Sequence, residues 1–249
     1  MFIEFQGIEN ARQLGGLTRA DGARIRENML LRTGMLEKAT DEDVRHLEEM
    51  GLAHIVDFRD IREVNDHPDR PVPGAKHHHF AALGNLQNLF KKHPDDPTMT
   101  ARELHHDFTQ LYRFLAQSPE SQDAYENFFR VLLESEGKPV LWHCTQGKDR
   151  TGVAGILLLI ALGFEEEQAL AEFMLTNTFA QKQLDALQAR GVPQERCEFM
   201  KEIFFVFYEN ARFFLDCLQL EYGNVYNYLE LVLGVGPKQI ERLEKYYLE

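Results

Sequence analysis

The segment VLWHCTQGKDRTG, residues 140–152, carries a cysteine and an arginine in a loop between an apolar, strand-like run and a helix-like run. Backbone amides at the start of a helix have no intrahelical partners, and together with the helix dipole they form a cradle for an anion. Such a cradle favours the thiolate form of a cysteine at its base. We therefore expect Cys144 to be largely ionised at neutral pH.

The remaining loop residues suit a single phosphate group. Arg150 can hold two phosphate oxygens in a bidentate contact, and Gly147 removes a side chain where the backbone must turn sharply or approach the anion. Lys148 adds a positive charge, and the Thr151 hydroxyl could donate a hydrogen bond to the Cys144 sulfur. The phosphate site that we expect comprises Cys144, Thr145, Gln146, Gly147, Lys148, Asp149, Arg150 and Thr151.

A thiolate beneath a phosphate can attack phosphorus in line and form a phosphocysteine, which water then hydrolyses. Positive charge around the equatorial oxygens stabilises the transition state of this reaction. The residues thus indicate hydrolysis of phosphate monoesters without metal or cofactor, with Cys144 as nucleophile and Arg150 as stabiliser of the oxyanion. A phosphate-binding module without turnover is the rival class, and the intact Cys144, Arg150 and Thr151 argue against it.

The flanking elements that must position this loop indicate an α/β fold, with a mostly parallel central sheet flanked by helices and a helical C-terminal extension. Residues 52–58 and 139–143 are typical of buried strands, the second of them central, and the first thirty-odd residues suit a hairpin or edge strands. Apolar spacing predicts helices near 41–50, 104–115 and 125–133, and a buried helix at 153–162. The remainder is expected as helices at 165–176, 180–190, 196–220, 225–233 and 237–247.

The charge of the chain excludes several partners. A formal charge of -13, from 40 acidic and 27 basic residues, disfavours nucleic acid and anionic membranes. The longest apolar run, 153–164, is well short of the roughly 20 residues that span a bilayer, so no stable membrane insertion is expected. Three widely spaced cysteines and the absence of a secretory signal favour a cytoplasmic protein, with secretion by a non-classical route left open.

The loop resembles the His-Cys-x5-Arg-Thr/Ser-Gly signature of the cysteine-dependent protein tyrosine phosphatase superfamily, in the bacterial and fungal branch with the form HCxxGKDR. The segments 10–16, NARQLGG, and 56–60, VDFRD, are similar to two further motifs of that branch, and the region 222–235 is similar to its C-terminal part. The resemblance implies a protein-tyrosine phosphatase, with phosphotyrosine proteins as first-choice substrates and phosphoinositides as the alternative. A single phosphatase domain over 1–249 is expected, in which the loose pattern of 85–120 could mark a mobile insertion and 165–249 is the helical part.

The general acid that protonates the leaving group is less clearly marked in the sequence. Related lipid phosphatases place an aspartate before the signature arginine, which makes Asp149 the first candidate and Asp57 the second. Asp149 could instead brace the loop by accepting backbone hydrogen bonds or by pairing with Arg12 or Arg59. A separate upstream loop, the usual location in the superfamily, offers Asp95, Asp96 and Asp107.

Other polar residues near these motifs have supporting roles or none. His143 precedes the cysteine in a strand, so its side chain should point to the other face and brace the site rather than deprotonate the thiol. Arg12 and Arg59 could support the site, or each could simply form a surface ion pair of little energetic value. The run His77-His78-His79 has no accompanying ligand at metal-binding spacing, so we expect no metal there. The aromatic segment 199–214 would either pack on the sheet or form an apolar wall or lid over the pocket.

Overall fold

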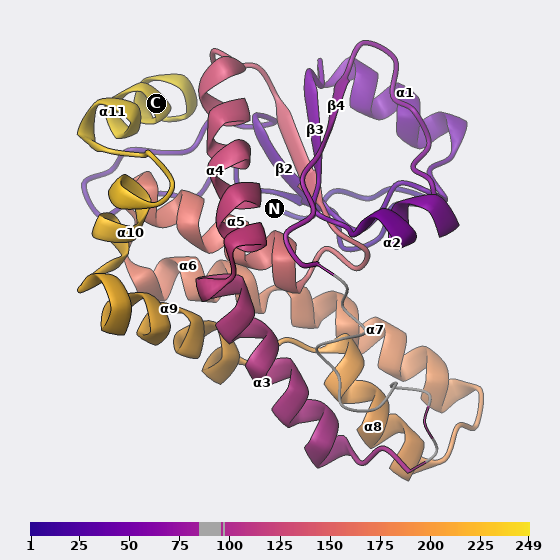
Figure 1. Cartoon of the computed structure of the whole chain (residues 1–249). Helices are drawn as coiled ribbons and strands as arrows, with labels where there is room; N and C mark the ends of the chain where they lie inside the picture. Colours follow the sequence, from indigo (N-terminus) through magenta and orange to yellow (C-terminus); the bar gives the residue numbers. More distant parts are fainter. Residues whose placement is uncertain (85–95, 97) are drawn as a thin grey trace.

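The computed structural model describes residues 1–84, 96 and 98–249, and a five-stranded sheet lies at its centre (Figure 1). The strand order is β1-β2-β5-β3-β4, in which β5 is central and only β1 runs antiparallel to its neighbour. This confirms the mostly parallel α/β sheet and the central position of the strand before Cys144. The strands are β1 (Arg12–Gln13), β2 (Leu30–Thr33), β3 (His54–Asp57), β4 (Lys76–His79) and β5 (Val140–His143).

The first thirty-odd residues confirm the expected antiparallel pairing, because β1 pairs with β2. However, β2 is an internal strand and not an edge, since it also pairs in parallel with β5, with Leu30 opposite Val140. The three inner strands are buried along almost their whole length. Buried parallel strands read as continuous apolar runs, which is why β5 and β3 could be recognised.

Alternate side chains of each inner strand are buried on opposite faces of the sheet. Successive side chains in a strand point to opposite faces. One set joins the larger core with α4 (Pro119–Glu134) and α5 (Asp149–Ala161), and it consists of Leu30, Val56, Val140 and Trp142. The alternate set packs against α1 (Asp41–Glu49), and it consists of Leu31, Ile55 and Leu141. In Figure 1, α1 and α2 (Ile61–Asp66) lie on one side of the strands and α4 on the other.

Helix α5 follows the loop directly, and every side chain from Arg150 to Ala161 is buried. Its apolar character all round, with Leu157, Leu158 and Leu159 fully buried, confirms the expected buried helix. It packs between the sheet, α4 and α6 (Glu166–Met174). A helix enclosed on all sides gives the loop at its N-terminus a rigid base.

The C-terminal half is helical, as expected, but the single helix predicted over 196–220 is wrong. The chain forms α8 (Gln194–Phe204) and α9 (Tyr208–Tyr222), separated by an extended segment. The break is held by Asn177 in α7 (Thr176–Ala189), whose amide donates to the Val206 carbonyl and accepts from its N–H, both at 2.9 Å. A tertiary contact thus replaces helical hydrogen bonds that the local pattern favoured. The chain ends with α10 (Val225–Leu231) and α11 (Pro237–Tyr247).

Helix α3 (Ala101–Gln117) connects the main body to the α7–α8 hairpin (Figure 1). It packs along α9 and against α8, where Leu104 meets Phe199. Of the segment 85–120, residues 85–95 and 97 lie outside the described residues, and 101–120 belongs to α3 and the start of α4. Among the described residues, no helix combines the length and apolar character needed to cross a bilayer.

Shortening a side chain of α5 should destabilise the whole domain. Leu158 is fully buried, so Leu158→Ala is expected to lower the free energy of unfolding by about 3 kcal/mol, through lost burial and a residual cavity. The matched control is Leu220→Ala, because Leu220 is 87% exposed and its loss should cost under about 0.5 kcal/mol. Urea unfolding followed by circular dichroism measures both, and equal effects would contradict α5 as the core helix.

Candidate active site

The loop between β5 and α5 forms an open anion cradle. Lys148 is the N-cap of α5, and its side chain makes no capping hydrogen bond, so the amides of the first turn remain available. Gly147 has φ +67°, and a Cβ there would lie 2.2 Å from the Thr33 carbonyl oxygen in the neighbouring β2. The loop therefore needs glycine at this position both for its conformation and for its close approach to β2.

Cys144 lies at a cavity of about 190 Å³. The cysteine follows β5 directly and is 2% exposed. The polar part of the lining consists of Cys144, Thr145, Gln146, Lys148, Asp149 and Arg150. The apolar part consists of Leu83, Phe108, Leu111 and Ile203. The structure thus gathers most of the residues expected at the phosphate site around one opening. Of the aromatic segment, Ile203 lines the cavity as part of its apolar wall, whereas Phe199 packs on α3 and not on the sheet.

Arg150 is held in a fixed orientation by Glu63, a residue that the sequence reasoning did not identify. Its Nη1 and Nη2 atoms donate to the two Glu63 carboxylate oxygens at 2.6 and 2.9 Å. Thr145 donates its hydroxyl to the same carboxylate. Burial alone would lower the pKa of Arg150, but these hydrogen bonds and the charge of Cys144 raise it. Glu63 uses the two terminal nitrogens, which leaves the Nε edge of the guanidinium for a phosphate.

Asp149 lies in the cavity beside two donors. Its Oδ1 atom accepts a hydrogen bond from the Tyr112 hydroxyl at 2.7 Å, and its Oδ2 atom lies 2.9 Å from Lys148 Nζ. The alternative in which Asp149 pairs with Arg12 or Arg59 is wrong, because both arginines are bound to other carboxylates. Burial and the neighbouring Asp149 raise the pKa of Tyr112 well above its usual range, so the phenol remains a donor.

Lys148 is also engaged. Its ammonium lies 4.4 Å from the centroid of the Phe108 ring and 3.5 Å from the Phe205 carbonyl oxygen, besides its contact with Asp149. Recognition of a second phosphate by Lys148 would therefore require it to leave these partners. Its side chain lines the cavity and contacts both α3 and the break between α8 and α9.

Asp57 lies beneath the loop and outside the cavity lining. Arg59 donates from Nε and Nη2 to both Asp57 oxygens at 2.8–3.0 Å, and its Nη2 lies 2.7 Å from Asp69 Oδ2. His143 is fully buried, with Nε2 3.1 Å from the same Asp69 oxygen, as expected for a brace on the side away from the cavity. Burial would lower the pKa of His143, but the Asp57 and Asp69 carboxylates raise it.

The atoms of Asp57, Asp69 and His143 lie within 4.8 Å of one another, a spacing that could hold a metal ion. However, the guanidinium of Arg59 already binds both carboxylates. We therefore interpret this group as a buried ion-pair network that fixes the ends of β3 and β5. Arg59 is not exposed at all, so the expected surface ion pair is wrong.

Arg12 is likewise buried, at 1% exposure, and not on the surface. It binds Glu172 on α6 at 2.6 Å, the Thr176 hydroxyl at 3.0 Å and the Asn10 side chain at 2.7 Å. Asn10 in turn donates to the carbonyls of Gln146 and Gly147 at 3.0 and 3.1 Å. The N-terminal motif 10–16 therefore supports the back of the loop.

The remaining predicted residues lie apart from the cavity or lack the expected contact. The Thr151 hydroxyl is buried without a hydrogen-bond partner among the described residues, so the expected bond to Cys144 Sγ is not formed. Asp96 bonds Thr98 in an exposed turn, and Asp107 is buried on α3. Asp95 lies outside the described residues.

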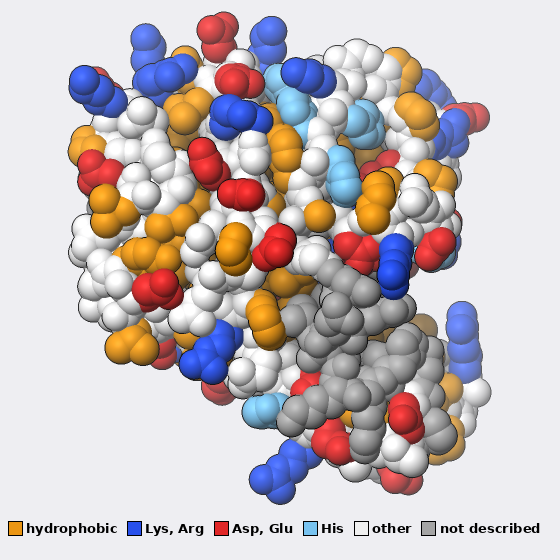
Figure 2. Space-filling view, viewed as in Figure 1, with side chains coloured by type: hydrophobic (Ala, Val, Ile, Leu, Met, Phe, Trp, Pro, Cys, Tyr) orange, Lys and Arg blue, Asp and Glu red, His pale blue; other side chains and the backbone are white. Residues whose placement is uncertain are grey.

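The histidine triplet forms the exposed strand β4, and histidine side chains gather near this edge in Figure 2. Alternation gives neighbouring histidines different partners, as expected. His78 Nε2 lies 3.1 Å from His54 Nδ1, whereas His79 Nε2 lies 2.8 Å from the Arg59 carbonyl oxygen.

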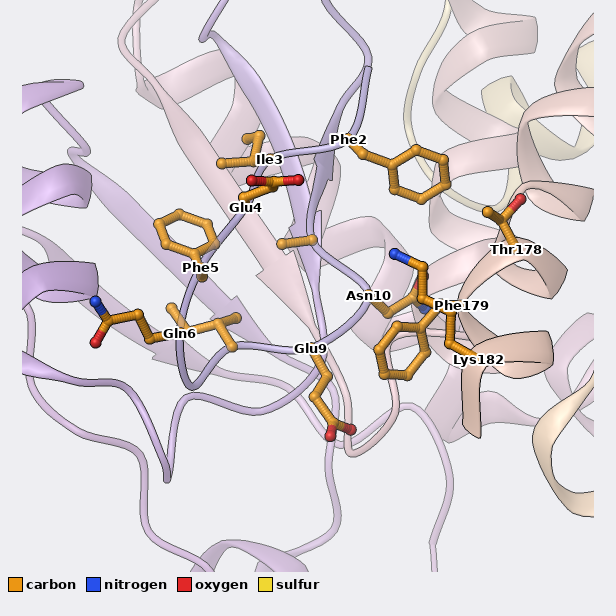
Figure 3. Close-up of a pocket in the computed structure, with 12 residues that line it drawn as sticks. Phe2, Ile3, Glu4, Phe5, Gln6, Glu9, Asn10, Thr178, Phe179 and Lys182 are labelled. Atoms are coloured by element: carbon orange, nitrogen blue, oxygen red, sulfur yellow. The ribbon is translucent and has the colours of Figure 1, made fainter. Parts of the chain in front are cut away.

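A second cavity of about 630 Å³ lies between the N-terminal segment and α7 (Figure 3). Figure 3 shows Phe2 and Phe5 on the N-terminal segment, with Phe179 and Lys182 across from them on α7. Asn10 lies in the lining of this cavity and also bonds the loop. Cys144 and Arg150 are not among the residues that line it.

Several residues that build the site were missed by sequence reasoning. They are Glu63, Asp69, Tyr112, Arg32 and Glu172. Only Glu63 had a local signal, because Asp60 and Glu63 form a capping box that starts α2. The others act through contacts between distant parts of the chain, for which a single sequence gives no local pattern.

Comparison with known proteins places the chain among phosphatases. A family model described as "Tyrosine phosphatase family" matches residues 3–249. A protein of Cupriavidus necator assigned as a tyrosine-protein phosphatase is 31% identical, over 96% of this chain and 86% of the relative. The triple specificity protein phosphatase PtpB of Mycobacterium tuberculosis is 28% identical, over 70% of this chain and 68% of the relative.

The free energy of unfolding should fall at low pH because of Glu63 and Asp69. Burial would raise the pKa of each carboxyl, but Arg150 holds the pKa of Glu63 at about 2, and His143 with Arg59 holds that of Asp69 at about 2. Because both values lie below those of the unfolded chain, about 4, the stabilisation is complete above that pH and is lost as pH falls towards 2. Chemical unfolding between pH 6 and 2 measures this, and Glu63→Gln should flatten the dependence.

The matched control for that measurement is Glu42→Gln, which removes a carboxylate from an exposed pair with Arg45. It should leave the acid dependence unchanged. A wild-type free energy of unfolding that is constant down to pH 2, or identical slopes for Glu63→Gln and wild type, would contradict the assignment.

Proposed function

This chain belongs to the tyrosine phosphatase family, and we propose that it hydrolyses phosphotyrosine in proteins through a phosphocysteine intermediate at Cys144. One observation carries the proposal. Cys144, Arg150 and Asp149 line a single cavity at the uncapped N-terminus of a buried helix. A nucleophile, a cation and a carboxyl group around an anion cradle are the parts that phosphoryl transfer needs.

In the first step, the Cys144 thiolate attacks phosphorus opposite the leaving phenolate oxygen. The S–P bond forms as the P–O bond breaks, and the phenolate takes a proton from the general acid. Arg150 and the amides at the start of α5 bind the equatorial oxygens, where they stabilise the charge of the transition state. Holding the ester in the cradle also makes the attack effectively intramolecular.

In the second step, water attacks the phosphorus of the phosphocysteine. The P–O bond to water forms, the S–P bond breaks, and the thiolate is regenerated. The residue that gave up its proton in the first step takes one from the water, and inorganic phosphate leaves. No metal or redox cofactor enters either step, so the reaction should proceed in EDTA.

We assign the general acid to Asp149. Among the described candidates it is the one in the cavity lining, whereas Asp57 is bound by Arg59 from both oxygens. The Tyr112 hydroxyl and Lys148 fix the orientation of the Asp149 carboxyl group.

The apolar wall favours an aryl phosphate over an inositol phosphate. Phe108, Leu111, Leu83 and Ile203 face the phosphate loop across the cavity and would contact a tyrosine ring. Lys148, which would recognise an additional phosphate, is engaged by Asp149 and Phe108. Phosphoinositides remain the alternative substrate. Because Ile203 of α8 lines the same cavity as Cys144, we also propose that residues 1–249 act as one phosphatase domain.

Replacing the nucleophile should abolish hydrolysis. Cys144→Ser is expected to lower kcat for p-nitrophenyl phosphate in EDTA by at least about 10³-fold, because a hydroxyl in the same cradle is far less ionised. Cys217→Ala, at a buried cysteine of α9, is the matched control and should keep wild-type kcat. Turnover by Cys144→Ser at the wild-type rate would refute the mechanism. Wild-type protein that binds phosphate and never turns over would support a phosphate-binding module.

The acid can be identified by the leaving group. Asp149→Asn should lower kcat/KM about 10²-fold for a phosphoserine peptide, whose alkoxide needs a proton, and far less for p-nitrophenyl phosphate. Asp57→Asn is the comparison, and it should not distinguish the two substrates, because Asp57 lies outside the cavity lining. Equal losses on both esters for Asp149→Asn would exclude the acid role. Parallel assays on phosphotyrosine peptides and phosphoinositides rank the two substrate classes.

A further inference from the structure

A buried guanidinium lies directly behind the phosphate loop. Arg32 on β2 is fully buried, and its Nη2 atom donates to the Gly147 carbonyl at 3.0 Å and contacts the Lys148 carbonyl at 3.4 Å. A peptide whose carbonyl faces Arg32 has its N–H on the opposite side, towards the anion cradle. Arg32 therefore fixes the orientation of the peptides on which the cradle depends.

The structure reserves space for this side chain. A Cβ at Gly155 would lie 3.2 Å from Arg32 Nη1, and a Cβ at Gly152 would lie 3.3 Å from Nη2 and 2.6 Å from the Phe173 ring. The two glycines form a niche against the first turns of α5, and a Cβ at either position would crowd the guanidinium. Gly152 thus leaves room for both the Phe173 ring and the Arg32 guanidinium.

The charge in this niche is not balanced. Arg12 and Arg32 share a single carboxylate, Glu172, at 2.6 Å each, and all three side chains are at most 3% exposed. Two cations and one anion leave one net positive charge buried behind the loop. The Nε atom of Arg32 also has no hydrogen-bond partner among the described residues. An uncompensated buried charge is costly, so it should be retained only where an anion balances it.

We propose that Arg32 is a positioning residue that acts through the loop: it turns the loop carbonyls away from the cradle and supplies the buried positive charge that favours the thiolate of Cys144. This inference rests on the proposed function, in which Cys144 is the nucleophile. Glu172 sets the size of the charge, and Arg12 holds Glu172 in place. The thiolate, or a bound phosphate, is then the anion that the cluster otherwise lacks.

Other charged groups also face Cys144 from each element packed around it. Burial and the charge of Arg12 lower the pKa of Arg32 to about 10, so Arg32 is still cationic at neutral pH. Burial lowers the pKa of the Met1 amino group, which interacts with Glu172 and Arg12. The further groups are Lys148, Asp149 and Arg150 of the loop and α5, Glu63 of α2, Tyr112 of α3, Tyr125 of α4 and His143 of β5 with Asp57 and Asp69.

Removing a cation from the cluster and removing its carboxylate should shift the pH at which Cys144 ionises in opposite directions. Arg32→Met removes the net positive charge, so a higher pH is needed to ionise Cys144. Glu172→Gln leaves two cations without their carboxylate, so Cys144 ionises at lower pH. A purely structural role predicts the same direction for both variants, because each would loosen the loop.

The test is the pH dependence of Cys144 alkylation by iodoacetamide, followed by mass spectrometry of its peptide in phosphate-free buffer. Arg32→Met should raise the midpoint pH of alkylation by about one unit, the size typical of one nearby buried charge. Glu172→Gln should lower it, and Arg32→Lys, which keeps the charge, should stay near wild type. Arg45→Met removes an exposed guanidinium and is the matched control. Circular dichroism confirms that each variant is folded.

Two results would overturn the proposal. One is a shift of Arg32→Met and Glu172→Gln in the same direction, and the other is an equal midpoint for Arg32→Met and Arg32→Lys. If Glu172→Gln does not fold, the comparison of Arg32→Met with Arg32→Lys still tests the proposal. Alkylation needs no substrate, so the two proposals can fail separately. If the midpoint pH of alkylation shifts as predicted but the protein hydrolyses no phosphotyrosine, only the proposed function is refuted. If the wild-type enzyme is active but the variants keep the wild-type midpoint pH of alkylation, only the role of Arg32 is refuted.

Discussion

The amides at the start of α5 must point into an open cavity without partners of their own, and the surrounding structure follows from this requirement. A helix end normally satisfies such amides with a capping side chain or water. Here Lys148 at the N-cap leaves them uncapped, and the loop before them is held from behind. The central strand β5 delivers Cys144 to the base of that opening, and a helix buried on every side keeps the opening in place.

Cations near the cavity are each held by carboxylates, and the balance of charge differs between the groups. Glu63 pairs with Arg150, and Asp57 with Asp69 neutralises Arg59 beneath the loop. Behind the loop, one carboxylate serves two arginines, which leaves positive charge where an anion is expected to bind. Breaking a buried pair costs several kcal/mol because it strands a charge. These groups therefore fix side-chain positions at the site more than they add to net stability.

The parts of the fold and site that are local in sequence could be predicted. The apolar run before Cys144, the all-round apolar helix after it and the capped start of α1 all have short-range signatures that the structure confirms. The loop motif itself identified the polar residues of the cavity, because phosphate binding needs those residue types within one turn of chain. The position of β5 at the centre of the sheet followed from its continuous burial.

What the sequence did not predict depends on distant contacts. Glu63 meets Arg150 across 87 residues, and Arg32 meets Glu172 across 140. A carboxylate or guanidinium in a surface-like context gives no sign that it will be buried against such a partner. The same reason explains the error at 196–220, where Asn177 replaces helical hydrogen bonds at Val206. Tertiary contacts there override the local preference.

The most direct test of this account is to find where the phosphoryl group resides during turnover. Wild-type enzyme is mixed with excess p-nitrophenyl phosphate, quenched in acid within the first turnovers and digested for mass spectrometry. The account predicts one phosphoryl group on the peptide that contains Cys144, in an amount that follows the steady-state rate. A phosphoryl group on any other residue, or turnover without a phosphorylated enzyme at any quench time, would contradict it.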